Sequence, residues 1–389
     1  MVVATVETRA DLVNEIPFNI PYSTADDMVY CRAALEDGHL SGDGRFTARA
    51  TELLAKIIPG TRSLLTTSCT HALELAAILL GLGPGDEVIM PSFTFVSTAN
   101  AFALRGAVPV FVDIRQETLN VDERKIEEAV TKRTRAIVVV HYGGVGAEMD
   151  AIDDIARRNS LTVVEDNAHG LGGLYKGRPL GALGAMASQS FHATKNIQCG
   201  EGGALVMTDP GLVIRAEIVR EKGTNRTQFR RGEVDKYTWL DLGSSYLPAE
   251  LLAAVLTAQL EHFEEIQRMR HRIWDAYHEM LKQWATSYDV QTPQPPRHVE
   301  HTAHLYHLVL PSADQQQSLI KHLGQLGIKA VSHYVPLHNS PGGATLGRLG
   351  GPCPVTEAVS DGLVRLPLYP GLTDAAVERV TEAVTSFFP

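Results

Sequence analysis

The sequence predicts a three-layer α/β domain with a mostly parallel sheet, followed by a smaller C-terminal α/β domain. Between residues 60 and 210, short apolar runs alternate with segments of helical periodicity. This alternation is typical of parallel strands joined by helices. The apolar runs are continuous, as expected for strands that helices cover on both faces. The chain has 389 residues, which is more than one small core accommodates.

The expected strands and helices can be placed along the chain in order. Strands are expected at residues 62–68, 86–91, 108–114, 135–142, 161–166, 185–191 and 202–208. Helices are expected between them at residues 70–82, 97–106, 122–130 and 150–159. From Pro248 to Ala285 the pattern predicts one long helix or two helices in series. We place an N-terminal segment and the large domain at residues 1–255, and the smaller domain at residues 256–389.

Composition and charge narrow the class of protein. Hydrophobic residues make up 44% and charged residues 21% of the chain, which is ordinary for a soluble globular protein. A net charge of -10 argues against broad binding to nucleic acid or to an anionic membrane, but it allows a local basic pocket for an anionic substrate. The four cysteines form no CxxC pair, and we find neither a signal peptide nor a membrane-spanning run. We therefore expect a cytoplasmic protein with free thiols.

Two of the expected strands end in residues that suit a cofactor, at the edge where open α/β sheets bind ligands. The small polar residues 67–70 lead directly into a helix, whose first N–H groups could bind a phosphate. An ordinary helix cap would use the same residue types. After the next strand, one of Phe93 and Phe95 could stack on a planar ring, and packing in the core is the alternative.

Two further strand ends carry ionisable residues. Glu165 and Asp166 end a strongly apolar strand, where a carboxylate is costly unless it has a partner. A structural ion pair or a cap is the alternative role for them, and His169 follows three residues later. Ser190 and Lys195 lie in SFHATKN, at the end of another strand. An isolated lysine is usually a solvated surface charge, so the neighbouring features decide its interpretation.

A phosphate site, an aromatic ring, a carboxylate and a lysine together are the groups that bind pyridoxal 5'-phosphate. The lysine forms a Schiff base with the cofactor's aldehyde, and the carboxylate keeps the pyridine nitrogen protonated. The lysine amine can also carry a proton, a role that a permanently charged arginine could not fill. The four features, in this order on the strand ends of one sheet, therefore predict a pyridoxal phosphate enzyme.

Several motifs resemble one family of such enzymes. The stretches TTSCT, PSFTFVSTANA, VVEDNAHG and SFHATKNIQCGEGG resemble the DegT/DnrJ/EryC1/StrS sugar aminotransferases. The resemblance covers nearly the whole chain, including HYVPLH and RLPLY. The stretch REKGTNRTQFRRGEVDKYTW is most similar to the branch that forms dTDP-4-amino-4,6-dideoxyhexoses. The resemblance implies the aspartate-aminotransferase-like (type I) fold, pyridoxal 5'-phosphate with pyridoxamine phosphate as its intermediate form, and a homodimer with shared active sites.

The resemblance also implies roles for individual residues at matching positions. Lys195 is expected to be the Schiff-base lysine and Asp166 the partner of the pyridine nitrogen, and we expect both to be catalytic. Ser245 stands where many members have an asparagine that reaches the phosphate of the other subunit, so this chain departs from the pattern there. The residues expected to bind the cofactor are Cys69, Thr70, Phe95, Asp166, His169, Ser190, Lys195 and Ser245.

The basic segment from Arg220 to Lys236 is expected to contact the substrate. Its basic residues outnumber its acidic ones in an otherwise acidic chain, and its Gly, Thr and Asn content predicts a loop. A solvated surface loop is the alternative, but the diphosphate of a nucleotide sugar must be met by cations or backbone donors. The residues expected to bind substrate are Arg226, Arg230 and Arg231 and, by the resemblance alone, His333 and Tyr334.

The predicted reaction transfers an amino group from an amino acid, L-glutamate, to C4 of a dTDP-4-keto-6-deoxyhexose. The alternatives are amination at C3 of a 3-keto nucleotide sugar, a pyridoxal phosphate sugar dehydratase and a non-catalytic sensor with the same fold. The dehydratase needs a lysine position without an amine, which Lys195 does not fit.

Two other classes fit the sequence less well, and no metal site is expected. The stretch GLGPGDE lacks the GxGxxG spacing of a nicotinamide dehydrogenase. In HTAHLYH, a strand would turn His304 away from His301 and His307. It would also separate those two by roughly 20 Å at about 3.3 Å per residue, too far to share a metal ion.

Overall fold

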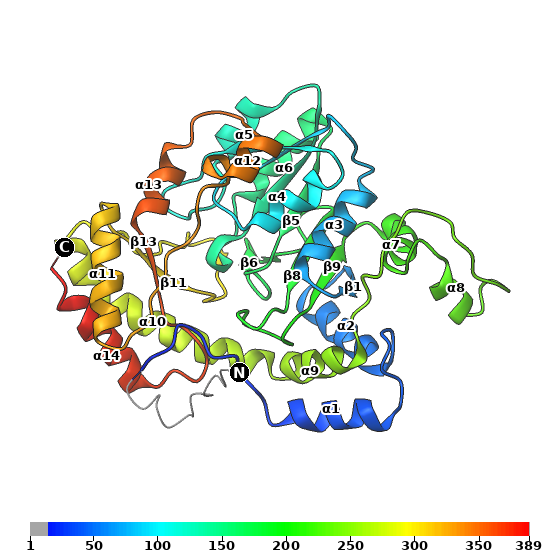
Figure 1. The fold of residues 1–389 in the computed structure, drawn as a ribbon, viewed down its shortest axis with the longest axis horizontal. Coiled ribbons are helices and arrows are strands. Elements are labelled where there is room, and N and C mark those ends of the chain that lie inside the picture. The colour runs from blue at the N-terminus through cyan, green and yellow to red at the C-terminus, as the bar shows by residue number, and fades with distance from the viewer. Residues whose placement is uncertain (1–14, 389) are drawn as a thin grey trace, which may run out of the picture.

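The computed structural model describes residues 15–388, which fold around one large sheet with a smaller domain at its side (Figure 1). The expectation that the chain starts without a signal peptide concerns residues outside this range. Within it, no helix is long and apolar enough to cross a membrane.

The large domain is built on an eight-stranded, mostly parallel sheet. Its strands are, in spatial order, β1 (Arg62–Thr66), β9 (Gly203–Met207), β8 (Met186–Ser190), β5 (Thr162–Asp166), β4 (Thr134–Val140), β2 (Glu87–Pro91), β3 (Val108–Val112) and β12 (Arg348–Leu349). From β8 to β12 every neighbouring pair is parallel. Only β9 runs against its neighbours, because it follows β8 through a loop without a helix and returns directly beside it.

Helices cover both faces of this sheet, which confirms the predicted three-layer arrangement. One layer comprises α3 (Cys69–Leu79), α4 (Val96–Ala103) and α7 (Val213–Arg220), and the other comprises α5 (Glu123–Ala129), α6 (Met149–Asn159), α2 (Arg45–Ile57) and α9 (Glu250–Glu261). Helix α1 (Asp26–Glu36) packs on the outside of α9 (Figure 1). In β2, Val88 and Met90 pack toward the first layer and Ile89 toward the second. Since successive side chains of a strand point to opposite faces, burial on both sides explains the continuous apolar runs.

The segment predicted as one or two helices forms two helices in series, α9 and α10 (Phe263–Ser287). The helices meet at His262, whose ring contacts Asp26 and Glu265. The packing changes along this pair: Ile266 belongs to the large-domain core, whereas Ile273 belongs to the C-terminal core. The division at residue 255 stays a prediction.

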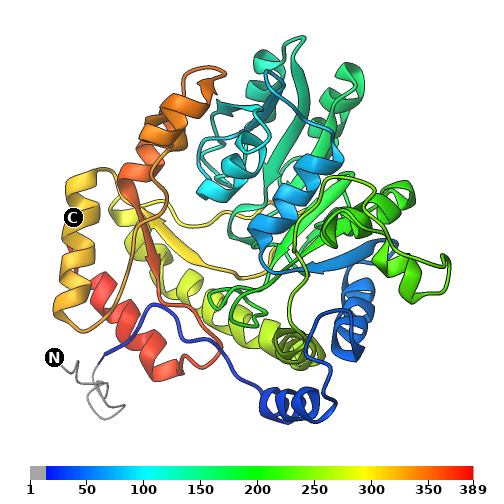
Figure 2. The same cartoon turned by 45° about the vertical axis from the view of Figure 1, so that its right-hand side comes forward.

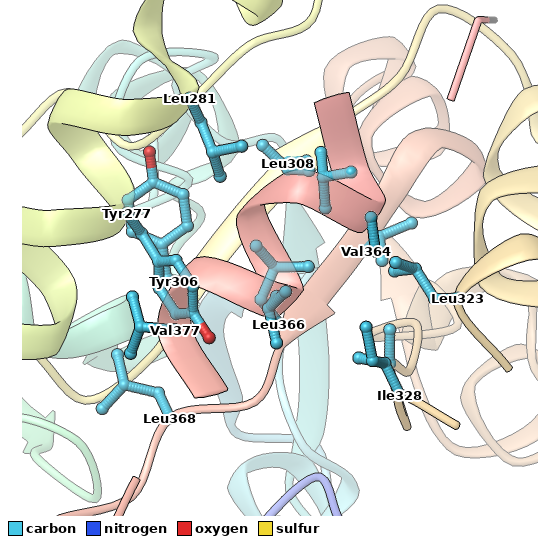
Figure 3. Packing of buried hydrophobic residues seen from close by; sticks show 14 of the residues in the cluster. Tyr277, Leu281, Tyr306, Leu308, Leu323, Ile328, Val364, Leu366, Leu368 and Val377 are labelled. Carbon is cyan, nitrogen blue, oxygen red and sulfur yellow. The ribbon is translucent and has the colours of Figure 1, made fainter. Parts of the chain in front are cut away.

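The C-terminal domain packs three helices and α10 around two strands. They are α11 (Ala313–Gln325), α13 (Pro354–Gly362), α14 (Asp374–Thr385), β11 (Tyr306–Val309) and β13 (Leu363–Leu366), with the strands antiparallel. Figure 3 shows this core, in which Tyr306 of β11 lies beside Tyr277 of α10, and Val364 of β13 lies near Leu323 of α11.

Two segments pair with parts of the fold that are far away in the sequence. Ile16, near the start of the described chain, forms a parallel bridge with Ile328 and packs into the C-terminal core. Conversely, β12 leaves the C-terminal region and pairs with β3 at the edge of the large sheet.

The remaining elements are short. They are α8 (Arg226–Arg230), α12 (Pro341–Leu346), β6 (Leu174–Tyr175), β7 (Arg178–Pro179), β10 (Val299–Glu300) and 3-10 turns at Tyr142–Gly144, Pro210–Leu212 and Leu337–Asn339. The HTAHLYH segment becomes a strand only at Tyr306, so His301 and His304 lie outside it.

Replacing Leu308 by alanine should lower the free energy of unfolding by about 2–5 kcal/mol, because the side chain is fully buried and its removal leaves a cavity. Urea unfolding followed by tryptophan fluorescence measures this effect, since Trp274 and Trp284 lie in the same core and Trp239 is exposed. The control is Leu326→Ala, which removes a side chain that is 43% exposed. An equal loss in both variants would contradict this account of the core.

Candidate active site

A cavity of about 680 Å³ lies at the carboxyl edge of the parallel strands. Residues that follow or end strands line it: Ser68, Cys69 and Thr70 after β1, Thr94 and Phe95 after β2, Asp166 at the end of β5 and Ser190 at the end of β8. Tyr334 and Arg365 of the C-terminal region also line it. The cavity therefore lies where open α/β sheets bind ligands, as expected.

Lys195 lies on the wall of this cavity, in the loop between β8 and β9. Its amine makes no hydrogen bond or ion pair with any residue between 15 and 388. Burial lowers the pKa of this amine, against the opposing effect of Cys69 and Asp166, and Arg365 lowers it further. A larger fraction of the amine is thus neutral near pH 7 than in an exposed lysine, and only the neutral form is a base or a nucleophile.

The residue next to the lysine is held by several partners. The side-chain amide of Asn196 donates to Gln267 Oε1 at 2.9 Å and to the Thr302 carbonyl at 2.8 Å. Its Oδ1 accepts from His304 Nδ1 at 2.8 Å. These partners come from α10 and from the segment before β11, so residues far along the chain position the loop that carries Lys195.

Glu165 and Asp166 are neighbours on β5, but they point to opposite faces of the sheet. Glu165 is fully buried away from the cavity, and its carboxylate is satisfied by protein groups. It accepts from the backbone N–H groups of Gly181, Leu183 and Gly184 at 2.7–2.8 Å and from His141 Nε2 at 2.9 Å. The structural role considered for this pair therefore applies to Glu165.

Asp166 is the carboxylate that faces the cavity. Its Oδ2 accepts a hydrogen bond from Thr98 Oγ1 at 2.7 Å, and that hydroxyl contacts Thr94 Oγ1 at 2.7 Å. Its Oδ1 accepts weaker contacts from the Ala168 N–H at 3.3 Å and from Ser188 Oγ at 3.5 Å. The carboxylate is thus oriented by neutral donors and has no cation paired with it among the described residues.

The N-terminus of α3 opens at the same cavity. Ser68 caps the helix by accepting from the His71 N–H at 3.1 Å, so the cap interpretation holds for this residue. Cys69 and Thr70 form the first turn and also line the cavity, and Thr70 Oγ1 lies 2.7 Å from Ser97 Oγ. A helix N-terminus with adjacent hydroxyls is a favourable place for a phosphate.

Aromatic rings also line the cavity. Phe95, at the start of α4, is 56% exposed and lies 6.3 Å from the ring of Tyr334. Phe93 is fully buried in the core, so Phe95 is the ring available to a ligand. His169 stacks on His304 with ring centroids 4.1 Å apart.

The histidines of this region are held neutral. Burial, followed by the charge of Lys195, lowers the pKa of His169 well below its usual range. Burial likewise lowers the pKa of His304 and of His333. His333 Nδ1 lies 3.0 Å from the Tyr142 hydroxyl, and both predicted substrate residues, His333 and Tyr334, line the cavity.

The three predicted substrate arginines do not line the cavity of their own chain. Arg226 pairs with Glu221 at 3.2 Å, and Arg231 pairs with Glu217 at 2.8 Å. Arg230 is exposed at the end of α8. This helix projects from the body of the molecule, as Figures 1 and 2 both show. Ser245 is also exposed, and it bridges Glu221 at the base of the same projection.

Sequence reasoning missed several residues of the site. Thr98 and Ser188 orient Asp166. The signal in the sequence that could have identified them is that each is a polar residue within an otherwise apolar, buried element. Arg365, in the apolar run LVRLPLY, was within a recognised motif but was not singled out. Phe18 and Asn19 reach the cavity from the N-terminal segment, for which the sequence carries no signal.

The residues present fit pyridoxal 5'-phosphate. The cavity combines an unpaired amine, a carboxylate, a helix N-terminus and an exposed ring, and each would meet a different part of that cofactor. No group of three or more His, Cys, Asp or Glu residues within 15–388 is arranged to hold a metal ion.

Residues 21–385 match the DegT/DnrJ/EryC1/StrS aminotransferase family. The chain belongs to this family. The aminotransferase is 35% identical to an uncharacterized protein of Methanocaldococcus jannaschii over 349 residues, which are 88% of this chain and 89% of that protein. The predicted family and enzyme class are thereby confirmed.

Solved structures agree with this assignment. The aminotransferase TlmJ from Streptoalloteichus hindustanus is similar with a TM-score of 0.87 and 29% identity, over 96% of this chain and 98% of TlmJ. The putative sugar aminotransferase Spr1654 from Streptococcus pneumoniae in its PMP-form gives a TM-score of 0.87 and 26% identity, over 96% and 97% of the two chains. The type I fold is confirmed, and so is the cofactor, because enzymes of this family use pyridoxal 5'-phosphate.

The neighbouring carboxylates should respond differently to removal of their charge. In Glu165→Gln an amide N–H replaces one acceptor, so a buried backbone donor loses its partner and the free energy of unfolding should fall by about 1–3 kcal/mol. Asp166→Asn should unfold close to the wild-type temperature but lose transamination by about 10² or more. Thermal unfolding and the absorbance change on adding L-glutamate measure the two effects. A loss of stability in Asp166→Asn together with a loss of activity alone in Glu165→Gln would contradict these roles.

Proposed function

We propose that this cytoplasmic aminotransferase moves an amino group from L-glutamate to C4 of a dTDP-4-keto-6-deoxyhexose, which gives a dTDP-4-amino-4,6-dideoxyhexose. The observation that carries the proposal is the placement of the unpaired Lys195 amine and the oriented Asp166 carboxylate on one cavity. Amination at C3 of a 3-keto nucleotide sugar is the competing acceptor position.

Each residue of the cavity would have a distinct task toward the cofactor. Bound pyridoxal 5'-phosphate supplies an electron sink for the electron pair that is left when a substrate carbon loses a proton. Asp166 would hold a proton on the pyridine nitrogen, because its negative charge is fixed at the cavity wall by Thr98. Cys69, Thr70 and Ser190 would bind the phosphate.

Lys195 would both attach the cofactor and move protons. Its Nζ atom is the only lysine amine on the cavity within residues 15–388, and burial favours its neutral form. A neutral amine at this place can take a proton from the substrate carbon and return it to another atom. Phe95 and His169 would flank the cofactor ring. The hydrogen bonds of the neighbouring Asn196 with Gln267 and Thr302 keep the lysine in position.

Two observations support a nucleotide sugar as acceptor. The segment REKGTNRTQFRRGEVDKYTW resembles the branch that aminates C4 of dTDP-linked sugars. In addition, Spr1654, which is similar over 96% of this chain, is described as a putative sugar aminotransferase. A phosphorylated substrate also fits a region rich in arginine next to an acidic body.

The three arginines do not line the active-site cavity of their own chain, so we propose a homodimer with shared sites. The projection around α8 exposes large apolar side chains, namely Phe229, Tyr237, Trp239, Leu240 and Leu242. Such side chains seldom cluster on the free surface of a monomer. In the proposed dimer they pack on the partner and carry Arg226, Arg230 and Arg231 toward its cavity.

The acceptor is tested by incubating the enzyme with dTDP-4-keto-6-deoxyglucose and L-glutamate and identifying the product by NMR. We expect a 4-amino-4,6-dideoxyhexose, and the coupling constants at C4 then distinguish the gluco from the galacto product. Conversion of a 3-keto nucleotide sugar alone would replace the proposed position by C3.

Replacing Lys195 by alanine should abolish transamination, because the variant has no amine to attach the cofactor or move the proton. Borohydride treatment followed by mass spectrometry should find covalently attached cofactor on Lys195 in the wild type and none in the variant. The matched control is Lys176→Ala, which alters an exposed lysine paired with Asp150. Retention of substantial activity in Lys195→Ala would overturn the assignment.

Replacing an arginine of the α8 projection should weaken the sugar-nucleotide step alone. We expect Arg230→Ala or Arg226→Ala to reduce dTDP-sugar binding by about 1.5–3 kcal/mol, the range for a hydrogen bond to a charged group. The L-glutamate step, read from the cofactor's absorbance, should be unchanged.

The control for the arginine variants is Arg158→Ala on α6, an exposed arginine paired with Glu127. Normal sugar binding in the single variants at Arg226, Arg230 and Arg231 would exclude this role. A fully active monomer in light scattering would exclude the shared site.

A further inference from the structure

The segment 302–304, just before β11, contacts two loops of the active site at once. One loop follows β5 and the other joins β8 to β9. Thr302 is fully buried, and its Oγ1 donates to the carbonyl of His169 in the first loop at 2.6 Å. Its own carbonyl accepts from the side-chain amide of Asn196 in the second loop at 2.8 Å. The two loops are therefore held at a fixed spacing by one short segment.

His304 makes a second pair of contacts with the same two residues. Its Nδ1 lies 2.8 Å from Asn196 Oδ1. Its ring stacks on the ring of His169, with centroids 4.1 Å apart and planes inclined by 20°. One imidazole can make both contacts, because its nitrogens form hydrogen bonds in the ring plane whereas stacking uses the ring face.

The direction of the hydrogen bond from His304 follows from the other partners of Asn196. The Thr302 carbonyl can only accept, so the atom that faces it is the amide nitrogen of Asn196. The amide oxygen therefore faces His304, and the hydrogen lies on His304 Nδ1. A replacement for His304 must offer a donor at this position to keep the contact.

The segment is itself held in an unusual backbone conformation. Arg270 of α10 is fully buried and donates to the carbonyls of Ala303 and His304 at 3.2 and 2.5 Å. Ala303 has a φ of 48°, in the left-handed region that residues other than glycine seldom adopt. Such a conformation persists only where surrounding contacts impose it, and it is frequent at active sites. Tertiary contacts, and not local preference, therefore set the geometry of the segment.

The placement of Lys195 depends on this segment. The lysine amine lies on the cavity wall, and its position follows from the backbone that carries it. The next residue, Asn196, has three side-chain hydrogen bonds, and two of them are made with the segment 302–304. An amine that moves a proton must lie close to the reacting carbon, and a misplacement of about 1 Å can cost about 10²-fold in rate.

We propose that His304 is a positioning residue of the transamination reaction. Its Nδ1–H holds the Asn196 amide, and with it the backbone of Lys195, while the face of its ring fixes the plane of the His169 ring at the same cavity. The inference rests on the proposed role of Lys195 in moving the proton, and it does not depend on which sugar accepts the amino group.

Three substitutions of His304 separate the two contacts in the holoenzyme. His304→Phe keeps a ring that can stack and removes the donor, His304→Asn keeps a donor near Nδ1 and removes the ring, and His304→Ala removes both. The reaction with L-glutamate is followed by the absorbance of the cofactor over a range of donor concentrations. We expect His304→Ala and His304→Phe to lower the saturating rate by about 10- to 100-fold. The concentration that gives the half-maximal rate should change little, because the donor's own contacts remain.

The Asn variant supplies the test that a merely structural residue would fail. His304→Asn should recover most of the rate that His304→Phe loses, since it restores a donor to Asn196. It should still change the visible circular dichroism of the bound cofactor, which reports the surroundings of the cofactor ring, because His169 has lost its stacking partner. Combining His304→Phe with Asn196→Ala should cost little beyond Asn196→Ala alone, since both changes break the same hydrogen bond.

The matched controls are His322→Phe and His322→Asn on α11. His322 bonds the Ala383 carbonyl at 3.0 Å and does not line the cavity, so both variants should react like the wild type. Thermal unfolding of every variant shows whether it is folded. If His304→Ala does not fold, the comparison of His304→Phe with His304→Asn supplies the answer.

Two results would overturn the inference. One is a wild-type saturating rate in both His304→Phe and His304→Ala. The other is an equal loss of rate in His304→Phe and His304→Asn that follows the fall in unfolding temperature, which would make His304 a structural residue only. Failure of the proposed function is separable from both. Activity retained in Lys195→Ala would refute the role of the lysine, whereas an inactive Lys195→Ala beside normal His304 variants would refute this inference alone.

Discussion

The site depends on keeping one lysine amine partly enclosed and unpaired. A buried ammonium is disfavoured, and a carboxylate in direct contact would restore it. In this chain Asp166 acts on Lys195 without forming an ion pair with it, because neutral donors hold the carboxylate at its place on β5. The loop that carries the lysine is fixed through Asn196 by partners from α10 and from the segment before β11. The placement of Lys195 therefore depends on contacts with other elements and not on the loop alone.

The alternation of side chains along β5 separates structure from chemistry. Glu165 closes the turn at residues 181–184 by accepting three backbone N–H groups, and it ties that turn to His141. Asp166, one residue later, faces the cavity and accepts one short hydrogen bond, from Thr98, and two longer contacts. A one-residue shift in the register of this strand would exchange these environments. The pairing of β5 with β4 and β8 over consecutive residues prevents such a shift.

The fold was largely predictable because each central strand is buried on both faces. Val88, Ile89 and Met90 show this in β2, and the same continuous apolar pattern marks β4. The break between α9 and α10 at His262 was harder to place, because residues 250–287 contain neither glycine nor proline to mark it. At the site, Asp166 ends a strand and Phe95 and Lys195 come shortly after one, and strand ends can be predicted from sequence.

Features that depend on distant contacts could not be predicted. Arg226 and Arg231 are basic residues in a loop, but their pairing with Glu221 and Glu217 depends on how the loop folds back on α7. Arg365 is one arginine among apolar residues, and only the pairing of β13 with β11 shows which way it points. The contribution of Phe18 depends on where the N-terminal segment runs, which local sequence does not determine.

The Ile16–Ile328 bridge and the pairing of β12 with β3 affect when parts of the fold can form during synthesis. Ile16 finds its partner at Ile328, and the edge strand β3 is completed by Arg348 and Leu349. Chains leave the ribosome from the N-terminus and domains usually fold as units during synthesis. Here the start of the described chain and one edge of the large sheet must wait until most of the C-terminal region has emerged. Between the synthesis of β9 and that of β12, the nascent large domain thus presents β3 as an open edge of its sheet.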